Sequence, residues 1–213
     1  MDNYEITAFH LDDSRSRSIF PIPMRCLIIG SSGSGKTNLL CNIILKYWIH
    51  YKNLYIYARS IDQPIYEKMK AVFNNIDKIE AHITNDGIIS VDDCESDSLV
   101  IFDDYILDKQ DKIKEYFIRS RSKNISCIYI GQNYSLLDLQ AIRTNSNFLI
   151  IFKQPNFYIK KIWSDFISND MTFEEFKSIC SICWKLKFGF ISIDLINNHI
   201  YNKFDSLNVN DLG

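Results

Sequence analysis

Apolar and polar residues alternate along this chain in two different patterns. Short runs of apolar, mostly β-branched or aromatic residues, bounded by polar positions, are typical of buried β-strands. Between these runs, apolar residues recur every three or four positions, as on one face of an amphipathic helix. The predicted strands are Cys26 to Ile29, Leu54 to Ala58, Lys78 to Ile83, Leu99 to Asp103, Ser126 to Gly131 and Phe148 to Phe152. The predicted helices are Thr37 to Ile49, Gln63 to Phe73, Asp111 to Ser120, Leu136 to Ile142, Phe157 to Ile167 and Thr172 to Leu186.

This order of strands and helices predicts an α/β fold, with a central, mostly parallel sheet flanked by helices. Near the C-terminus, the segments FGFISIDL and NHIYNKF predict a β-hairpin that turns at Asn197 and Asn198. A chain of 213 residues, of which 46% are hydrophobic, can bury the core of one domain. We therefore expect residues 1–213 to form a single domain, with flexible ends at residues 1–18 and 205–213.

Composition limits the possible partners and compartments. The formal net charge is −2 and the pI is about 6.1, so any contact with DNA must come from a local surface. The N-terminus lacks the apolar segment of a secretory signal, and no apolar run approaches the length of a membrane span. We therefore expect a soluble, intracellular protein without a membrane partner, whose six cysteines stay reduced.

The segment GSSGSGKT carries the most specific chemical signal. Gly30, Gly35, Lys36 and Thr37 match the phosphate-binding pattern G-x-x-x-x-G-K-[ST], between a predicted strand and a predicted helix. In such a loop, backbone N–H groups surround the phosphates, the lysine reaches the β and γ phosphates, and the threonine hydroxyl ligates Mg²⁺. The candidate nucleotide-binding residues are Gly30, Ser31, Ser32, Gly33, Ser34, Gly35, Lys36, Thr37 and Asn38.

Polar side chains also follow two later predicted strands. Asp103 and Asp104 end the apolar run LVIF, where Asp103 could hold Mg²⁺ and Asp104 could orient or deprotonate an attacking water. Alternatively, Asp104 could cap the next helix. Gln132 follows the run CIYIG and could contact both the γ phosphate and water, or could simply end a buried strand.

Two further motifs have simpler interpretations. Cys180 and Cys183 look like half of a zinc site, but no second pair of ligands follows at a suitable spacing. They recur with Phe173 and Phe176 at helical spacing, so we predict that they pack in a core. The tetrapeptide NKFD (residues 202–205) matches a GTPase motif, but no D-x-x-G segment follows the phosphate loop at the required place.

Taken together, the segments GSSGSGKT, LVIFDD, RSRSKNISCIYIGQNY and IRTNSNFLIIFK resemble those of the viral DNA-packaging ATPases of the FtsK/HerA superfamily. This is the poxvirus type, also found in other large DNA viruses and virophages, and the resemblance covers roughly residues 10–195. It implies a RecA-like P-loop NTPase fold of the ASCE type, with ATP and Mg²⁺ as cofactors. It also implies a homo-oligomeric ring that drives double-stranded DNA into a capsid, with a capsid or portal component as partner, in the host cytoplasm or a virus factory.

The resemblance also implies roles for individual residues. Lys36 and Thr37 would bind phosphate and Mg²⁺, Asp103 would be the metal acid, Asp104 the catalytic acid and Gln132 the sensor. An arginine would complete the site of a neighbouring subunit, with Arg121 as the first candidate and Arg143 as the second. Only spacing separates Arg121 from Arg119 in this role.

Other interpretations remain open at this point. A cluster of basic residues could grip DNA in a ring or could form a solvated helix face. Its members are Lys109, Lys112, Lys114, Arg119, Arg121 and Lys123. The chain could also be a non-packaging translocase or helicase of the same superfamily, or a small-molecule kinase. The pair of aspartates with a downstream glutamine favours water over a second substrate as the phosphate acceptor.

Overall fold

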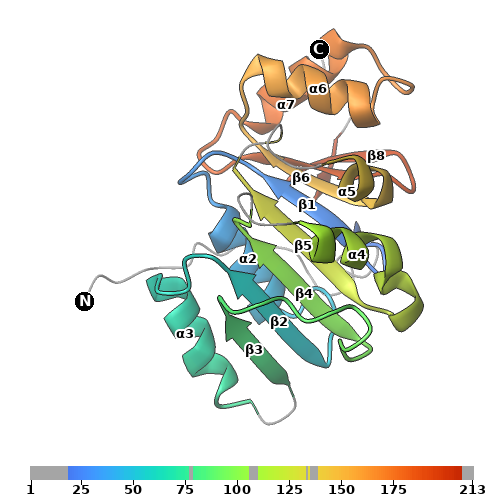
Figure 1. Ribbon diagram of the computed structural model, residues 1–213. Coiled ribbons are helices and arrows are strands. Elements are labelled where there is room, and N and C mark those ends of the chain that lie inside the picture. Colours follow the sequence, from blue (N-terminus) through green and yellow to red (C-terminus); the bar gives the residue numbers. More distant parts are fainter. Residues whose placement is uncertain (1–18, 77–78, 106–109, 133, 135–138, 208–213) are drawn as a thin grey trace.

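The computed structural model describes residues 19–76, 79–105, 110–132, 134 and 139–207. Within these residues, the strands form one nine-stranded sheet flanked by helices, which confirms the predicted α/β class (Figure 1). The strands are β1 (Arg25–Ile29), β2 (Asn53–Ala58), β3 (Glu80–Thr84), β4 (Ser98–Asp103), β5 (Ser126–Gly131), β6 (Phe148–Phe152), β7 (Phe190–Asp194), β8 (His199–Asn202) and β9 (Asp205–Ser206). The helices are α2 (Lys36–Leu45), α3 (Pro64–Phe73), α4 (Asp111–Arg119), the 3₁₀ helix η1 (Ser120–Lys123), α5 (Leu139–Asn145), α6 (Asn156–Phe166) and α7 (Phe173–Cys183).

The strand order places all three candidate chemical segments at one edge of the sheet. The order is β3-β2-β4-β5-β1-β6-β7-β8-β9, and the strands from β3 to β6 are parallel. In a parallel sheet, the carboxyl ends of the strands meet at the same edge. The phosphate loop after β1, the acids at the end of β4 and Gln132 after β5 therefore lie on neighbouring strands.

Two buried clusters hold the helices against the sheet, one on each face. Cys26 and Ile28 of β1 belong to the first cluster, whereas Leu27 and Ile29 belong to the second. This alternation follows from the two-residue period of a strand, and it explains why β1 is apolar on both faces. Helices α2 and α3 contribute to the first cluster, and α4, α6 and α7 to the second.

The CSIC motif lies in this second cluster. Cys180 and Cys183 are buried on the inner face of α7, which confirms the prediction of core packing. Among the described residues, no group of three or more His, Cys, Asp or Glu side chains could hold a metal ion.

Helix α2 ends earlier than the sequence pattern predicts, at Leu45 and not at Ile49. The backbone N–H of Tyr47 donates to Ile44 O and that of Trp48 donates to Ile43 O, while Tyr47 has a φ of 54°. These bonds form a Schellman motif, in which a left-handed residue closes the helix and is usually glycine. Because the chain uses tyrosine there, its sequence gives no stop signal.

The remaining boundaries differ from the predictions by smaller amounts. Helix α7 ends at Cys183, before the predicted Leu186. Part of the predicted strand at Lys78 and of the predicted helix at Leu136 lies outside the described residues, as does the N-terminal segment 1–18. Asp205 and Ser206, which we expected in a flexible tail, pair with β8 as strand β9, and residues 208–213 lie outside the described residues.

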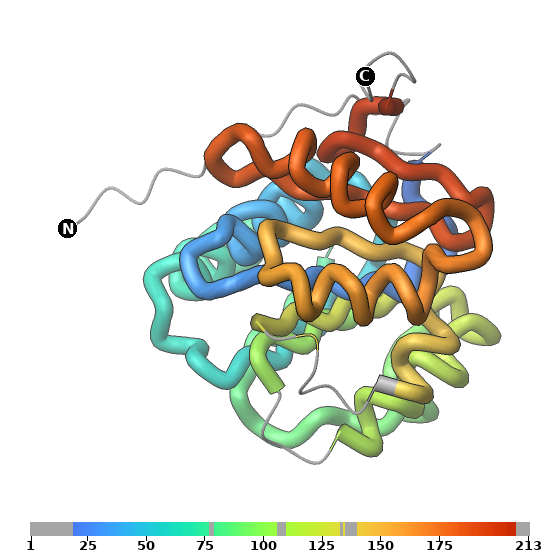
Figure 2. Tube along the Cα trace, turned by 90° about the horizontal axis from the view of Figure 1, so that it is seen from above, coloured from blue at the N-terminus to red at the C-terminus, as the bar shows by residue number. Residues whose placement is uncertain are grey.

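The C-terminal hairpin is confirmed. Strands β7 and β8 are antiparallel and are joined by a turn in which Asn198 has a φ of 54°. The NKFD segment forms the next turn, between β8 and β9, where Phe204 packs against Phe20, Trp48 and Phe190. Both views place α6, α7 and the hairpin together at one end of the sheet (Figure 2).

A tight turn connects α7 to β7. The N–H of Gly189 donates to Leu186 O, and a Cβ atom on Gly189 would lie 2.1 Å from Cys183 O. Only glycine therefore fits at position 189, directly before β7.

We expect Gly189→Ala to lower the free energy of unfolding by about 2–4 kcal/mol, because the clash is with rigid backbone. Denaturant unfolding measures this change. Gly87→Ala is the control, because nothing lies within 4 Å of a Cβ at that position, and it should stay within about 1 kcal/mol of the unsubstituted chain. Equal stabilities of the two variants would contradict the packing at Gly189.

Candidate nucleotide site

Two glycines shape the loop between β1 and α2. Gly33 and Gly35 have φ angles of 73° and 106°, and Gly35 is the N-cap residue of α2. L-residues with a side chain rarely adopt these angles. At Gly30, a Cβ atom would lie 2.5 Å from Ser34 Oγ and 2.7 Å from Phe152 Cβ. The three glycines therefore permit a loop that turns back over β1 and directs the start of α2 toward the space above it.

A cavity of about 530 Å³ opens above this loop. Residues from five parts of the chain line it: Ser32, Gly33, Gly35, Lys36, Thr37, Asn38, Ser60, Gln63, Asp103, Asp104, Ile130, Gly131, Gln132 and Phe188. Lys36, Thr37, Asp103, Asp104 and Gln132 are thus on one cavity, together with Ser32, Gly33, Gly35 and Asn38 of the predicted nucleotide-binding set. Gly30, Ser31 and Ser34 of that set are not among the lining residues.

Lys36 lies at the base of the cavity and is mostly buried. Its Nζ donates hydrogen bonds to Gly30 O at 2.6 Å and to Ser31 O at 2.8 Å. Burial lowers the pKa of Lys36, and the nearby carboxylates of Asp103 and Asp104 oppose this shift. The ammonium group is therefore held by two loop carbonyls, near the negative charges of Asp103 and Asp104.

Asp103 ends β4 and is held by a residue that the sequence did not single out. The hydroxyl of Tyr66, a fully buried residue of α3, donates a hydrogen bond to Asp103 Oδ2. Burial raises the pKa of the Asp103 carboxyl, and Asp104 adds to this effect, whereas the Tyr66 hydrogen bond and Lys36 oppose it. Tyr66 thus fixes one oxygen of Asp103 and leaves the other for the cavity.

Asp104 has a left-handed backbone, with a φ of 61°. Its N–H donates to Ile130 O at 3.1 Å, and its Oδ2 accepts from Gln132 Nε2 at 3.2 Å. Left-handed residues other than glycine are unfavourable by about 1–3 kcal/mol and cluster at functional sites. In a regular strand, consecutive side chains point to opposite faces. The left-handed turn at Asp104 instead allows both Asp103 and Asp104 to line the cavity. Helix α4 has Gln110 at its N-cap, so the alternative capping role of Asp104 for that helix is wrong.

The residues on this cavity fit a nucleoside triphosphate with Mg²⁺. The left-handed glycines leave a cradle of backbone, and Ser34 Oγ is buried without a hydrogen-bond partner among the described residues. Thr37 and Asp103 line the same cavity as Lys36. Mg²⁺ typically takes one or two protein oxygens and completes its shell with phosphate and water, so one hydroxyl and one carboxylate suffice.

Four residues at this site carry no motif that identifies them. Ser60 and Gln63 lie in the loop after β2, Tyr66 lies on α3, and Phe188 precedes β7. Gln63 and Tyr66 fall within the predicted helix Gln63 to Phe73, and Phe188 begins the first segment of the predicted hairpin, but neither prediction assigned these residues to the site. Contacts that bring these distant segments onto the phosphate loop are visible only in the folded chain.

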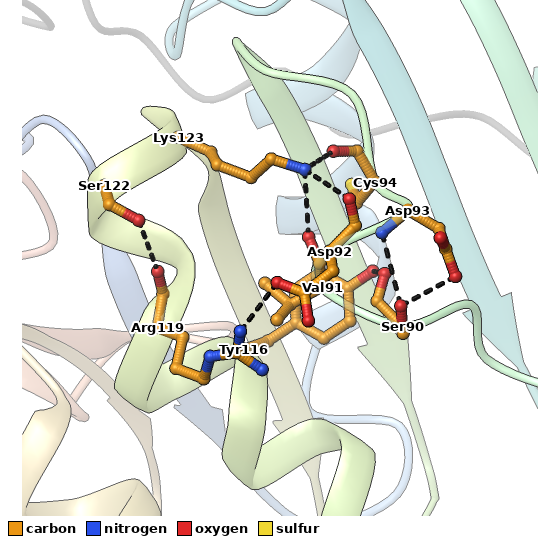
Figure 3. Close-up of polar contacts among 9 residues, drawn as sticks. All are labelled: Ser90, Val91, Asp92, Asp93, Cys94, Tyr116, Arg119, Ser122 and Lys123. Atoms are coloured by element: carbon orange, nitrogen blue, oxygen red, sulfur yellow. Dashed lines mark hydrogen bonds and ion pairs between the residues drawn. The ribbon is translucent and has the colours of Figure 1, made fainter.

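The basic cluster near η1 is largely engaged inside the molecule (Figure 3). Arg119 Nη2 lies 2.6 Å from Asp92 Oδ1, and Lys123 Nζ donates to the carbonyls of Val91, Asp92 and Cys94. Lys112 donates to Ile88 O, and Lys114 pairs with Asp111, while Lys109 lies outside the described residues. Lys112, Arg119 and Lys123 thus tie the loop before β4 to α4 and η1.

The two candidate arginines lie in different environments. Arg121 is exposed, and its side chain forms no hydrogen bond or ion pair with any of the described residues. It precedes β5, whose six residues separate it from the cavity edge by about 20 Å. Arg143 Nη1 instead pairs with Asp165 Oδ2, which also accepts from the Tyr134 hydroxyl. Arg121 is therefore free for a partner, whereas Arg143 joins α5 to α6.

The fold and this cavity define a P-loop ATPase of the RecA-like type. The chain belongs to the family of poxvirus A32 proteins, whose family pattern matches residues 14–162. This match confirms the resemblance to viral packaging ATPases that the sequence motifs indicated. None of the curated proteins matches the sequence significantly.

Solved structures with the same fold include the genome packaging NTPase B204 from Sulfolobus turreted icosahedral virus 2. Its complex with sulfate is 14% identical, with a TM-score of 0.57, and the match covers 84% of this chain and 95% of that chain. Its complex with ATP-gammaS is 13% identical, with a TM-score of 0.56 over the same shares of both chains. B204 from Sulfolobus turreted icosahedral virus, described as a DNA-packaging ATPase, is 15% identical with a TM-score of 0.55, covering 82% of this chain and 94% of that chain.

We expect Tyr66→Phe to raise the Mg²⁺ concentration that half-saturates ATP hydrolysis by about 10-fold, because a residue that hydrogen-bonds to a metal ligand orients that ligand. The measurement is a Mg²⁺ titration of the hydrolysis rate at saturating ATP. Tyr51→Phe is the control, since it removes another buried hydroxyl, which donates to Ile44 O at 3.1 Å away from the cavity. If the two variants had the same Mg²⁺ dependence, Tyr66 would have no positioning role.

Proposed function

We propose that this chain is the ATPase subunit of a ring-shaped motor that moves double-stranded DNA during viral genome packaging. One observation carries the catalytic part: Lys36, Thr37, Asp103, Asp104 and Gln132 line a single cavity at the carboxyl edge of the sheet. Membership of the poxvirus A32 family and the fold shared with B204 genome packaging NTPases support the packaging part.

The residues on the cavity have complementary roles in hydrolysis. The loop N–H groups and Lys36 bind the phosphates, and Lys36 exchanges its contacts with Gly30 O and Ser31 O for contacts with phosphate oxygens. Thr37 and Asp103 would hold Mg²⁺, which would neutralise the charge that develops on the phosphates. Asp104 orients the attacking water and accepts its proton, and Gln132 holds the Asp104 carboxylate in place.

Arg121 acts from a neighbouring subunit. It lies at the amino edge of the sheet, whereas the cavity lies at the carboxyl edge, so Arg121 cannot reach the nucleotide of its own subunit. Contact between two different surfaces of identical chains closes a ring when the rotation between subunits is suitable. An arginine supplied in this way stabilises the transition-state charge and accelerates hydrolysis by factors of about 10³ to 10⁵.

DNA contact comes from a few cations in each subunit. The net charge is −2, and most cations near η1 are engaged in internal contacts. In a ring, even one or two phosphate contacts from each subunit converge on a central channel, so their number is multiplied by symmetry. Such contacts are to the DNA backbone and carry no sequence specificity, as a motor that moves a whole genome requires. A capsid or portal component would hold the ring at its working position.

Among the described helices, none has the length and apolarity that a membrane crossing needs. A non-packaging translocase or helicase of the same superfamily would use the same cavity. Membership of the poxvirus A32 family, together with the fold shared with B204 over 84% of this chain, favours packaging.

The central test is the rate of ATP hydrolysis against protein concentration, with and without long double-stranded DNA. The rate per subunit should rise steeply with concentration, because sites are shared between subunits, and should rise again with DNA. Asp104→Asn is the negative control. It should still bind ATP and should hydrolyse it at least about 100-fold more slowly. A rate per subunit that depends on neither concentration nor DNA would contradict the motor.

Mixing two inactive variants tests the role of Arg121. Arg121→Ala subunits keep an intact cavity and Asp104→Asn subunits keep the arginine, so mixed rings should regain part of the activity that neither variant has alone. The measurement is ATP hydrolysis across a range of mixing ratios. Arg119→Ala, which only breaks the ion pair with Asp92, should retain activity. Mixed rings of verified composition without any recovered activity would rule out action in trans.

A further inference from the structure

Phe188 gives the nucleotide cavity an aromatic surface that the hydrolytic residues do not explain. The lining residues are mostly glycine or polar, with Ile130 and Phe188 as the apolar exceptions. Ile130 is fully buried in the sheet, whereas Phe188 is half-buried. An aromatic ring in this position exposes an apolar face beside a site that otherwise binds charged and polar groups.

The backbone holds Phe188 in an unfavourable conformation. Its φ is 60°, in the turn that Gly189 closes through its hydrogen bond to Leu186 O. A bulky residue rarely adopts this angle, and such outliers cluster at ligand sites, where the surrounding structure maintains them. Gly189 supplies that constraint, because it packs directly against Cys183 O.

The ring lies against the phosphate loop itself. A Cβ atom on Gly35 would be 3.2 Å from Phe188 Cδ1, so the missing side chain of Gly35 leaves room for the edge of the ring. Lys187 Nζ lies 4.9 Å from the centre of the same ring. Phe188 therefore has a cation near its ring and contacts the loop at its edge.

The strand order indicates which part of a nucleotide faces Phe188. The acids follow β4 and Gln132 follows β5, and both strands lie on one side of β1. Phe188 precedes β7, which lies on the other side of β1, beyond β6. Since the γ phosphate must face Asp104 and Gln132, a triphosphate that follows the loop places its nucleoside end toward Phe188.

We propose that the Phe188 ring stacks on the nucleobase and forms the base subsite of the cavity. This inference rests on the proposed ATPase function and extends it. Stacking uses the π face that every base has, so it contributes to affinity without selecting one base. The nearby Lys187 ammonium adds an electrostatic contribution through the ring.

The test compares nucleotides with a ligand that lacks a base. Dissociation constants of ATP, GTP and inorganic tripolyphosphate are measured by calorimetry for the unsubstituted chain and for Phe188→Leu. We expect ATP and GTP to bind about 5- to 100-fold more weakly to the variant, with the affinity for tripolyphosphate unchanged. Phe157→Leu is the control, since Phe157 is 71% exposed on α6 and is not among the cavity residues, and it should bind all three ligands normally.

Each alternative result has a separate meaning. Unchanged ATP affinity in Phe188→Leu, or an equal loss for tripolyphosphate, would overturn the stacking role while leaving the ATPase intact. An unsubstituted chain that binds neither ATP nor tripolyphosphate would instead contradict the proposed function.

A second variant, Phe188→Trp, keeps a stacking ring. The fluorescence of the new tryptophan should be quenched by ATP and not by tripolyphosphate. Equal responses to the two ligands would also overturn the proposal.

Discussion

The parallel pairing of β1 with β5, and of β5 with β4, is the constraint on which the rest of the site depends. This pairing aligns Ile29 with Gly131 and Asp103 with Ile130, so three strands end at one level. The phosphate loop, the aspartate pair and Gln132 are separated by long stretches of sequence. Each nevertheless lies at the carboxyl end of one of these three strands. A slip of two residues in either pairing would move the acids about 7 Å from the loop.

Electrostatic balance at this edge then determines how each group is held. Lys36 is stabilised by two loop carbonyls and faces two carboxylates, while Asp103 receives a hydrogen bond from Tyr66. A buried ammonium or carboxylate without such partners would shift toward its neutral form. Asp104 and Gln132 line the same cavity and are hydrogen-bonded to each other.

The two edges of the sheet have different tasks. The carboxyl edge carries the nucleotide residues on both sides of β1, from the acids after β4 to Phe188 before β7. The amino edge carries η1, which Lys123 fastens to the loop before β4 through three backbone carbonyls. This fastening holds Arg121 on a rigid support and leaves its side chain exposed, an arrangement that suits contact with a second copy of the chain.

The sequence alone determined the fold class and the chemistry of the strand ends. Periodic apolar runs identify strands because a buried parallel strand is apolar on both faces, and a glycine-rich loop with lysine and threonine has few other uses. The sequence could not reveal that Tyr47 ends α2, because a left-handed tyrosine depends on the local hydrogen bonds that close the helix. It could not show that Arg119 pairs with Asp92 while Arg121 is exposed, or that Tyr66 and Phe188 lie at the nucleotide cavity. These positions depend on contacts between segments that lie far apart in the chain, and only tertiary structure decides which of these segments meet.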